Sequence, residues 1–293
     1  MIRLKVEEIV KYMAENIPRG RVGALEKALA FIVRDFKIWW TYKLWITLDI
    51  LSSLTFVATY FFVSMIITPQ ALIESGYAAD FLTFSIIGIS LQHYVFTSVS
   101  SLSDAIREEQ WNGTMETILS STTSFKVFLL GESAFRFIIG SYFLLASFGM
   151  GVLLGMRLIL NPESMLAVLV LIILLVASHM VIGILGAAMI LKLKQGDPIV
   201  WAFSWLTQLF SGVLYPLGLL PDWLKWVGNA FPLTYSLDGL RRCLMNGVGF
   251  NNPTIVENTV KLLAFIAVVL PFSLRFFKKS YDSTRREGAL GQY

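Results

Sequence analysis

The chain is poor in the side chains from which most catalytic and metal-binding sites are built. Its 293 residues include one cysteine and two histidines, and 15% are charged, whereas soluble proteins average about 25%. Cys243 has no second cysteine to pair with, which excludes an internal disulfide. His93 and His179 lie on different apolar segments without acidic neighbours close by in the sequence. This arrangement argues against a metal or acid–base centre.

Common nucleotide and hydrolase motifs are also missing. The chain has no G-x-x-x-x-G-K-[ST] phosphate loop and no G-x-S-x-G nucleophile elbow. We therefore expect no enzymatic activity, no bound ATP and no other cofactor in this chain. The first 43 residues contain no apolar run of the secretory type, so we expect the first membrane span to direct targeting.

Long apolar runs, in contrast, are abundant. The chain is 56% hydrophobic with a mean hydropathy of +0.67, and a helix needs about 20 mostly apolar residues to cross a bilayer. We therefore predict an all-α integral membrane protein with six transmembrane helices. The runs cover residues 44–68, 81–103, 137–156, 165–191, 199–216 and 256–277.

The 24 lysines and arginines lie mostly outside these runs and on one predicted side. They concentrate in residues 1–43, the 104–136 connection, the 192–197 loop and the tail from residue 275. The positive-inside rule then places both termini in the cytoplasm of a multi-pass plasma-membrane protein. This distribution indicates orientation in a membrane, and we expect no nucleic-acid partner.

Residues 1–43 form a cytoplasmic amphipathic segment ahead of the membrane domain, 44–277, and the tail, 278–293. Apolar residues recur at helical spacing, which predicts a helix lying in the membrane interface. A weaker stripe precedes it, from Val6 to Ile17, for which packing against a soluble partner is the alternative. The main stripe consists of Leu25, Leu29, Ile32, Phe36 and Trp39.

A short charged stretch, residues 104–124, interrupts the apolar sequence after the second run. Asn112 and Gly113 tolerate left-handed backbone angles and should break the helix there. Thr114 can cap a new helix, and Glu116 in its first turn faces the positive end of the helix dipole. Such an element suits docking to a partner protein, and the alternative is a helix that merely lies on the membrane.

The motif Arg107-Glu108-x-x-Trp111-x-Gly113-Thr114-x-Glu116-x-Ile118-Leu119 resembles the coupling element of type-2 ABC exporter permeases. Two later landmarks support the resemblance: FSGVLYP at 210–216, and LPDWL at 220–224 followed by FPLTY at 231–235 and LDGLR at 237–241. Phe231 departs from the asparagine more usual before Pro-Leu-Thr-Tyr. The resemblance spans about residues 30–275.

The resemblance implies an export permease that pairs with a second permease copy and two ATP-binding-cassette ATPase subunits. ATP and magnesium would be bound by those subunits, and membrane lipids would surround the spans. The 192–197 loop would make a smaller contact with the ATPase. The residues implied in ATPase coupling are Arg107, Glu108, Trp111, Gly113, Thr114, Met115, Glu116, Ile118 and Leu119.

The outer segment, residues 217–247, is too short and too interrupted by proline for two full spans. A helical hairpin that enters the membrane from outside and turns back fits both facts, and its backbone must be covered by other helices. We expect this segment to contribute to an outer gate formed by Pro216, Trp223, Phe231, Pro232 and Tyr235.

Two polar stripes run along otherwise apolar spans. Polar groups facing lipid are costly, so each stripe should face protein or a cavity. Hydrogen bonding between helices is the alternative to a substrate path, and it is favoured for the second span. The candidate path residues are Ser90, His93, Thr97, Trp201, Ser204, Trp205, Gln208, Ser211 and Tyr215.

Ionisable groups within the spans are few. Asp49 lies about one turn inside the first span, where we expect it to be hydrated. Glu132 and Arg136 are four residues apart and should neutralise each other.

These features favour the membrane subunit of an ATP-driven exporter of a drug-like amphiphile or lipid. A polysaccharide or glycolipid is the alternative substrate, because sugars also stack on aromatic rings. The alternative of another class is a channel or membrane scaffold that works without an ATPase.

Overall fold

The computed structural model describes residues 23–67, 70–78, 80–193 and 198–288, and the regular structure in these ranges is helical. Five helices in them are long and apolar enough to cross a membrane. These are α3 (Lys43–Ser64), α5 (Phe81–Trp111), α7 (Phe125–Leu153), α8 (Pro162–Leu193) and α12 (Pro253–Arg286).

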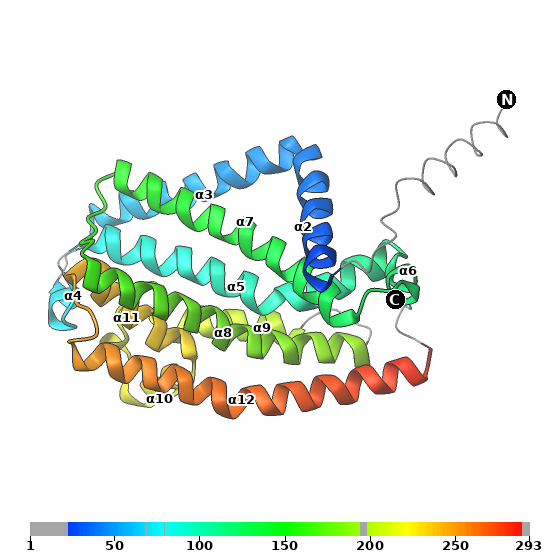
Figure 1. Ribbon diagram of the computed structural model, residues 1–293. Coiled ribbons are helices and arrows are strands. Elements are labelled where there is room, and N and C mark those ends of the chain that lie inside the picture. The colour runs from blue at the N-terminus through cyan, green and yellow to red at the C-terminus, as the bar shows by residue number, and fades with distance from the viewer. Residues whose placement is uncertain (1–22, 68–69, 79, 194–197, 289–293) are drawn as a thin grey trace.

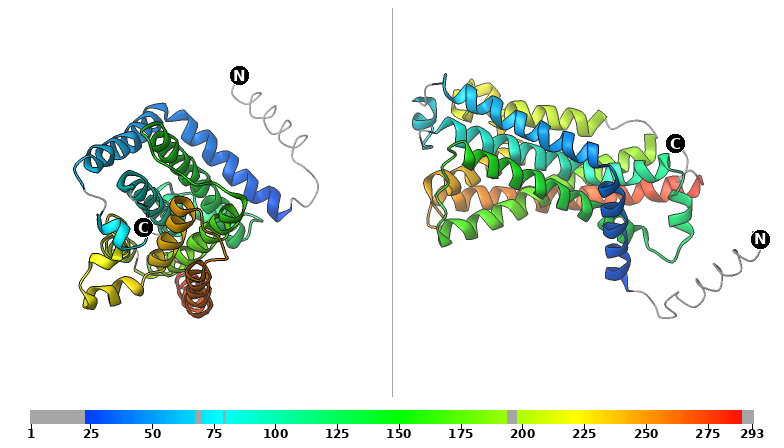
Figure 2. Two further views of the ribbon diagram at one scale, coloured as in Figure 1. Left: turned by 90° about the vertical axis from the view of Figure 1, so that its left-hand side faces the viewer. Right: turned by 90° about the horizontal axis from the view of Figure 1, so that it is seen from above.

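The long helices run alongside one another, and the shorter elements gather at the two ends of the bundle (Figures 1 and 2). The helix α2 (Ala24–Thr41) lies across one end, where α6 (Met115–Ser120) is also found. The helices α4 (Gln70–Glu74), α10 (Asp222–Asn229) and α11 (Pro232–Asn246) lie toward the opposite end. The predicted cytoplasmic and outer segments therefore occupy opposite ends.

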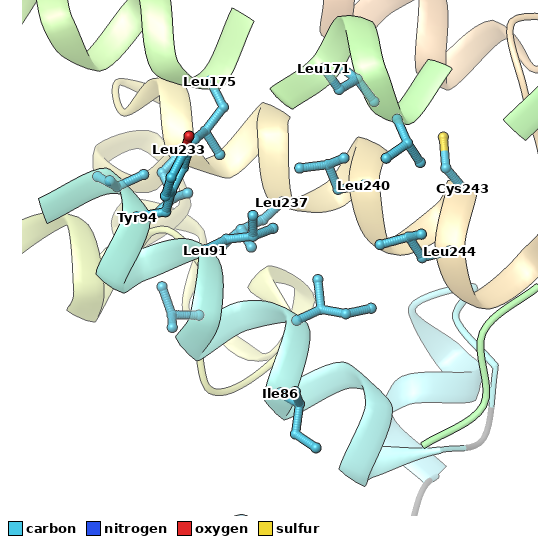
Figure 3. Packing of buried hydrophobic residues seen from close by; sticks show 14 of the residues in the cluster. Ile86, Leu91, Tyr94, Leu171, Leu175, Leu233, Leu237, Leu240, Cys243 and Leu244 are labelled. Carbon is cyan, nitrogen blue, oxygen red and sulfur yellow. The ribbon is translucent and has the colours of Figure 1, made fainter. Parts of the chain in front are cut away.

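The central helix is α5, which packs against α7 and α8 and has 22 buried residues. The helix α12 packs on α8, and α3 packs on α7. Figure 3 shows Leu237 and Leu240 of α11 close to Leu91 of α5 and Leu171 of α8. The outer segment is thereby part of the hydrophobic core, as its broken backbone requires.

The fifth apolar run does not form a full span. Its helix, α9 (Pro198–Phe210), has 13 residues, about 20 Å at 1.5 Å per residue, whereas the hydrocarbon core is about 30 Å thick. Gly212, at φ +76°, turns the chain two residues after the helix ends. The 3₁₀ turn η1 (Leu217–Leu219) then leads to α10. The described residues thus confirm five of the six predicted spans.

Several helices extend beyond the apolar runs from which they were predicted. The second span continues as α5 to Trp111, and α7 begins at Phe125. The helix α12 has 34 residues, about 50 Å of helix, which exceeds the hydrocarbon thickness. Hydropathy marks only the part of a helix that suits lipid, so these charged extensions were not predicted as parts of the spans.

Large apolar side chains cover the outside of the bundle. In α3 the one buried residue is Val57, and α12 exposes Val260, Val268 and Phe272. A water-soluble protein rarely leaves such continuous apolar patches uncovered. These faces therefore suit contact with lipid or with another membrane subunit.

Three expectations concern residues outside the described ranges. They are the weaker stripe in residues 1–22, the ATPase contact expected in the 192–197 loop, of which residues 194–197 are not described, and the end of the tail, 289–293.

Candidate functional site

The break that separates α5 from α6 lies where the sequence predicts it. The helix α5 ends at Trp111, Gly113 adopts φ +69°, and α6 begins at Met115 with Glu116 in its first turn. Thr114 occupies the cap position but makes no side-chain capping bond. Its hydroxyl donates instead to the Glu109 carboxylate. The predicted capping role of Thr114 is therefore wrong.

The apolar side of α6 faces the bundle. Met115 is 1% exposed and packs in a cluster with Ile106 and Phe128, while Ile118 and Leu119 are half-buried against it. These three coupling candidates thus hold α6 to its own chain. The exposed candidates at the tip are Trp111, Gly113, Thr114 and Glu116.

The remaining coupling candidates lie on the last turn of α5. The Arg107 guanidinium carbon is 5.8 Å from the centre of the Trp111 ring, within cation–π range. The exposed Glu108 accepts from Arg136 Nη2 at 2.6 Å. Arg107 and Glu108 therefore lie next to the exposed tip, at the end of α5.

A charge cluster with buried carboxylates joins α2 to this element, and it was not predicted from the sequence. Arg34 Nη2 lies 2.7 Å from Glu109 Oε1 and also pairs with Glu132, while Arg34 Nε pairs with Asp35 at 2.8 Å. Burial lowers the pKa of Arg34, but attraction by Glu132, Asp35 and Glu109 raises it further, so the net shift is upward. Arg34 is therefore a permanent cation between three carboxylates.

The expected pairing of Glu132 with Arg136 is wrong. Glu132 binds Arg34, and Arg136 binds Glu108. Spacing of four residues permits contact on a helix, but partners on other helices can approach the same side chains. A short sequence window does not reveal those partners.

One face of α2 packs closely on α7. Lys27 Nζ donates to the Thr122 carbonyl at 2.7 Å, and the Phe31 and Phe128 rings lie 5.5 Å apart, edge to face. Gly131 permits the approach, because a Cβ there would lie 2.9 Å from the Ala28 carbonyl oxygen. The predicted apolar stripe of α2 points elsewhere: Leu25, Leu29 and Phe36 are exposed and Ile32 and Trp39 half-exposed.

A cavity of about 680 Å³ opens between α3, α5, α7 and α9. Six of the nine predicted path residues line it, so the two polar stripes converge on one site. These six are Ser90, His93, Trp201, Ser204, Trp205 and Gln208.

The other three path candidates lie elsewhere. Thr97 donates to the His93 carbonyl, and its methyl group would lie 3.4 Å from a Cβ on Gly140 of α7. Ser211 lines a separate 170 Å³ cavity near α11. The Tyr215 hydroxyl donates to the Leu209 carbonyl. Thr97 and Tyr215 are thus hydrogen-bonded to the backbone of their own segments, whereas the buried Ser211 hydroxyl has no partner among the described residues.

The first span contributes a cavity wall that the sequence analysis did not predict. Asp49, Ser53, Phe56 and Tyr60 of α3 line the cavity together with Ser52 and Val57. Their spacing of three and four residues places them on one helix face, and this stripe was visible in the sequence. Asp49, expected to be merely hydrated, belongs to the candidate site.

The cavity combines ring faces with hydrogen-bonding groups. Gln92 Nε2 donates to the Ser204 carbonyl at 3.1 Å, and Ser53 and Ser147 hydroxyls are 2.8 Å apart. Gln92 Oε1 and the Ser204 hydroxyl have no partner among the described side chains and main chain. An apolar wall with a few available polar groups is typical of a small-molecule site.

The outer end of the bundle is organised by Arg241, which is 2% exposed. Its guanidinium donates to the carbonyls of Gly212 and Val213, each at 2.6 Å, and of Phe84 at 3.1 Å. Gly88 leaves room for this contact, because a Cβ there would lie 2.1 Å from the Val213 oxygen. The two motifs FSGVLYP and LDGLR are thus in direct contact.

Asp238, from the same motif, joins three segments at this end. It accepts from the Tyr77 hydroxyl at 2.6 Å, from Arg242 Nε at 2.9 Å and from Asn258 Nδ2 at 2.8 Å. Burial, with Asp238 beside it, raises the pKa of Tyr77 well above its ordinary value. The Tyr77 hydroxyl therefore keeps its proton and serves as a donor.

The five predicted gate residues do not meet at one point. Pro216 and Pro232 are buried, whereas Trp223 is 70% exposed. The Phe231 ring packs 5.5 Å from Phe203 of α9, and the Tyr235 hydroxyl donates to the Asn229 carbonyl at 2.6 Å. They surround the junction of α9, α10 and α11 as parts of separate contacts.

Comparison with known proteins agrees with this architecture. Residues 43–275 match the family described as "ABC-2 family transporter protein". A 69-residue stretch is 33% identical to "ABC transporter G family member 20" of Dictyostelium discoideum, over 22% of this chain and 10% of that protein. Within the described ranges, no group of three or more His, Cys, Asp or Glu side chains could hold a metal ion. The chain, which spans a small part of that relative's length, belongs to the ABC-2 transporter family as a transport membrane subunit.

Proposed function

We propose that this chain is the permease of an ATP-driven exporter that moves an amphiphilic, drug-like or lipid molecule out of the cytoplasm or the inner leaflet. The observation that carries the proposal is the 680 Å³ cavity with its mixed aromatic and polar wall. A cavity of this size accommodates a drug-sized molecule. A polysaccharide or glycolipid is the alternative, because sugars also stack on aromatic rings and the wall offers hydroxyl and amide groups.

The exposed tip formed by Trp111, Gly113, Thr114 and Glu116 is the proposed docking site for the ATPase. It lies at the end of the bundle opposite the outer segment, and its inner face is anchored by Met115. A rigid connection of this kind transmits a push from the ATPase to α5 and α7. Two ATPase subunits would serve two permease copies, and each would bind its own ATP and magnesium.

The second permease copy is proposed to face α9. Trp201 and Trp205 are 58% and 66% exposed in the single chain, and such large rings are commonly covered at protein interfaces. The cavities of two copies would then meet and form one route. The helix α9 with the segment after it would complete the sixth crossing, and the residues around α10 and α11 would form a re-entrant outer gate.

The orientation follows from the basic residues and from α2. The concentration of lysines and arginines at the end that holds α2 and α6 supports a cytoplasmic position of both termini beneath the plasma membrane. The exposed stripe of α2, which includes Leu25, Leu29 and Phe36, supports its proposed position in the membrane interface.

The proposed route predicts that cavity variants change substrate response. In Trp201→Ala or Gln208→Leu, stimulation of ATP hydrolysis by substrate should fall several-fold, because a stacking face or a polar contact is lost. Because Trp201 lies on the face proposed to meet the second copy, size-exclusion chromatography of each variant checks that assembly is intact. The measurement is ATPase activity of the reconstituted complex against substrate concentration. Unchanged stimulation in both variants would contradict a role in the route.

The proposed docking site predicts that Glu116→Arg uncouples the complex. An ATPase of soluble size should co-purify with the wild-type permease in mild detergent and be reduced at least tenfold with the variant. Gly113→Val should act similarly, because φ +69° is strained for a β-branched residue. Exposed Glu257→Gln is the matched control. A permease that transports normally without any such ATPase would favour a channel or scaffold.

A further inference from the structure

The cavity between α3, α5, α7 and α9 is lined by one acidic residue and by no lysine or arginine. Asp49 is the single carboxylate among its lining residues, and no lysine or arginine lines it. Asp49 makes no ion pair with any residue that the structure describes. An unpaired carboxylate beside an apolar wall attracts a cation more strongly than it would in water.

The same wall presents several aromatic rings. Ring faces carry negative electrostatic potential and attract cations, most strongly when water is excluded. Six rings besides that of His93 line the cavity, from all four of its helices: Phe56, Tyr60, Phe96, Phe143, Trp201 and Trp205.

The carboxylate and the rings are arranged lengthwise. Along α3 the lining residues run from Asp49 through Ser53 and Phe56 to Tyr60, a distance of about 16 Å at 1.5 Å per residue. Asp49 lies near the end of α3 that adjoins α2, about 9 Å from its first residue. A ligand with a charged head at Asp49 would extend its apolar body along Phe56 and Tyr60.

We propose that this cavity selects lipophilic organic cations, with Asp49 as the counter-ion and the aromatic wall as the apolar contact. The inference rests on the proposed function in taking this cavity as the substrate site. Anionic amphiphiles would meet the Asp49 charge without a compensating cation. Phospholipids are disfavoured for the same reason, because no lining lysine or arginine is present to bind their phosphate.

His93 is the lining group that competes most directly for Asp49. A protonated imidazole in the same cavity would supply the missing counter-ion, so binding is best measured at pH 8, where a histidine of ordinary pKa is neutral. The other polar lining residues are serines, glutamines and Tyr60, which are uncharged at that pH.

The test is equilibrium binding to the full-length permease in nanodiscs of zwitterionic lipid, without ATPase or ATP. The probe is radiolabelled (4-phenylbutyl)trimethylammonium, and its control is the uncharged isostere in which carbon replaces nitrogen. Empty nanodiscs correct for partition into lipid. We expect the cation to bind about tenfold more tightly than the isostere, which corresponds to ~1.4 kcal/mol.

Variants of Asp49 and Phe56 test whether these residues cause the preference for the cation over the isostere. Asp49→Asn should abolish the preference for the cation, and Asp49→Glu should retain most of it. Phe56→Leu should weaken binding of the cation more than binding of the isostere. Glu257→Gln, an exposed acid on α12 outside the cavity, should leave the preference intact. Thermal unfolding of each variant shows whether it is folded, and Phe56→Leu provides an independent test if Asp49→Asn unfolds.

The possible outcomes separate this inference from the proposed function. Equal binding of the two probes, binding of neither, or a preference that survives Asp49→Asn would overturn cation selection. If both probes bind equally and Trp201→Ala weakens both, cation selection fails while amphiphile export stands. An Asp49-dependent preference in a permease that proves unable to export would support the site and refute the transport proposal.

Discussion

Arg241→Met is expected to remove most of the folded permease from detergent extracts. The guanidinium is fully buried and satisfies the carbonyls of Gly212, Val213 and Phe84, where α9 ends and α5 begins. Methionine fills similar space but donates no hydrogen bond. Each buried carbonyl left unpaired costs about 1–3 kcal/mol, so we expect a loss of at least about 3 kcal/mol. Thermal unfolding in detergent, followed by size-exclusion chromatography, measures the effect.

Two further variants test the physical reason for this loss. Arg241→Lys should restore little of the lost stability, because an ammonium group cannot donate to three carbonyls with the planar geometry of a guanidinium. Lys225→Met should shift the melting temperature by only a degree or two, since its pair with Asp222 lies at the surface of the same outer segment. Wild-type stability of Arg241→Met would show that the outer segment does not depend on this contact.

Arg34→Met is expected to uncouple ATP hydrolysis from transport. The change leaves Asp35, Glu109 and Glu132 close together without their cation, and like charges so placed repel one another. Glu109 also accepts from Thr114 at the start of α6, so the damage should reach the proposed docking tip. Efflux from vesicles that contain the permease and its ATPase should fall tenfold or more, and ATP hydrolysis should fall less.

The double variant Arg34→Met, Glu132→Gln distinguishes charge repulsion from a simple loss of contact. Removing one carboxylate should restore part of the coupled transport. Lys37→Met is the matched control, because Lys37 is exposed on the same helix. If the control loses as much efflux as Arg34→Met, the general charge of α2 and not the buried cluster would be responsible.

The location of the spans and of the helix break was predictable from local sequence. Five apolar runs became long helices, because the requirement for about 20 apolar residues depends on composition within a short window. Gly113 ended α5 as expected, because a positive φ depends mainly on the residue itself. The length of the helix in the fifth run was overestimated. Gly212 and Pro216 change a hydropathy average little, but the helix α9 ends before them.

The partners of polar side chains were predicted less well. Glu132 has a basic residue four positions away and nevertheless binds Arg34 from a different helix. Asp49 was expected to be hydrated at the membrane boundary, yet it lines the cavity that His93 and Gln208 also line. In both cases the deciding neighbour is distant in the chain.

By itself, the amino-acid sequence determined the class of protein, the approximate spans and the position of the helix break at Gly113. Those properties follow from residue type and spacing over one or two dozen positions. Only the tertiary structure decided that Arg241 binds the Val213 carbonyl, that Arg34 joins α2 to α5 and α7, and that Asp49 lines a cavity with aromatic walls. Each of these depends on how separate helices pack, and helix periodicity alone does not specify which faces meet.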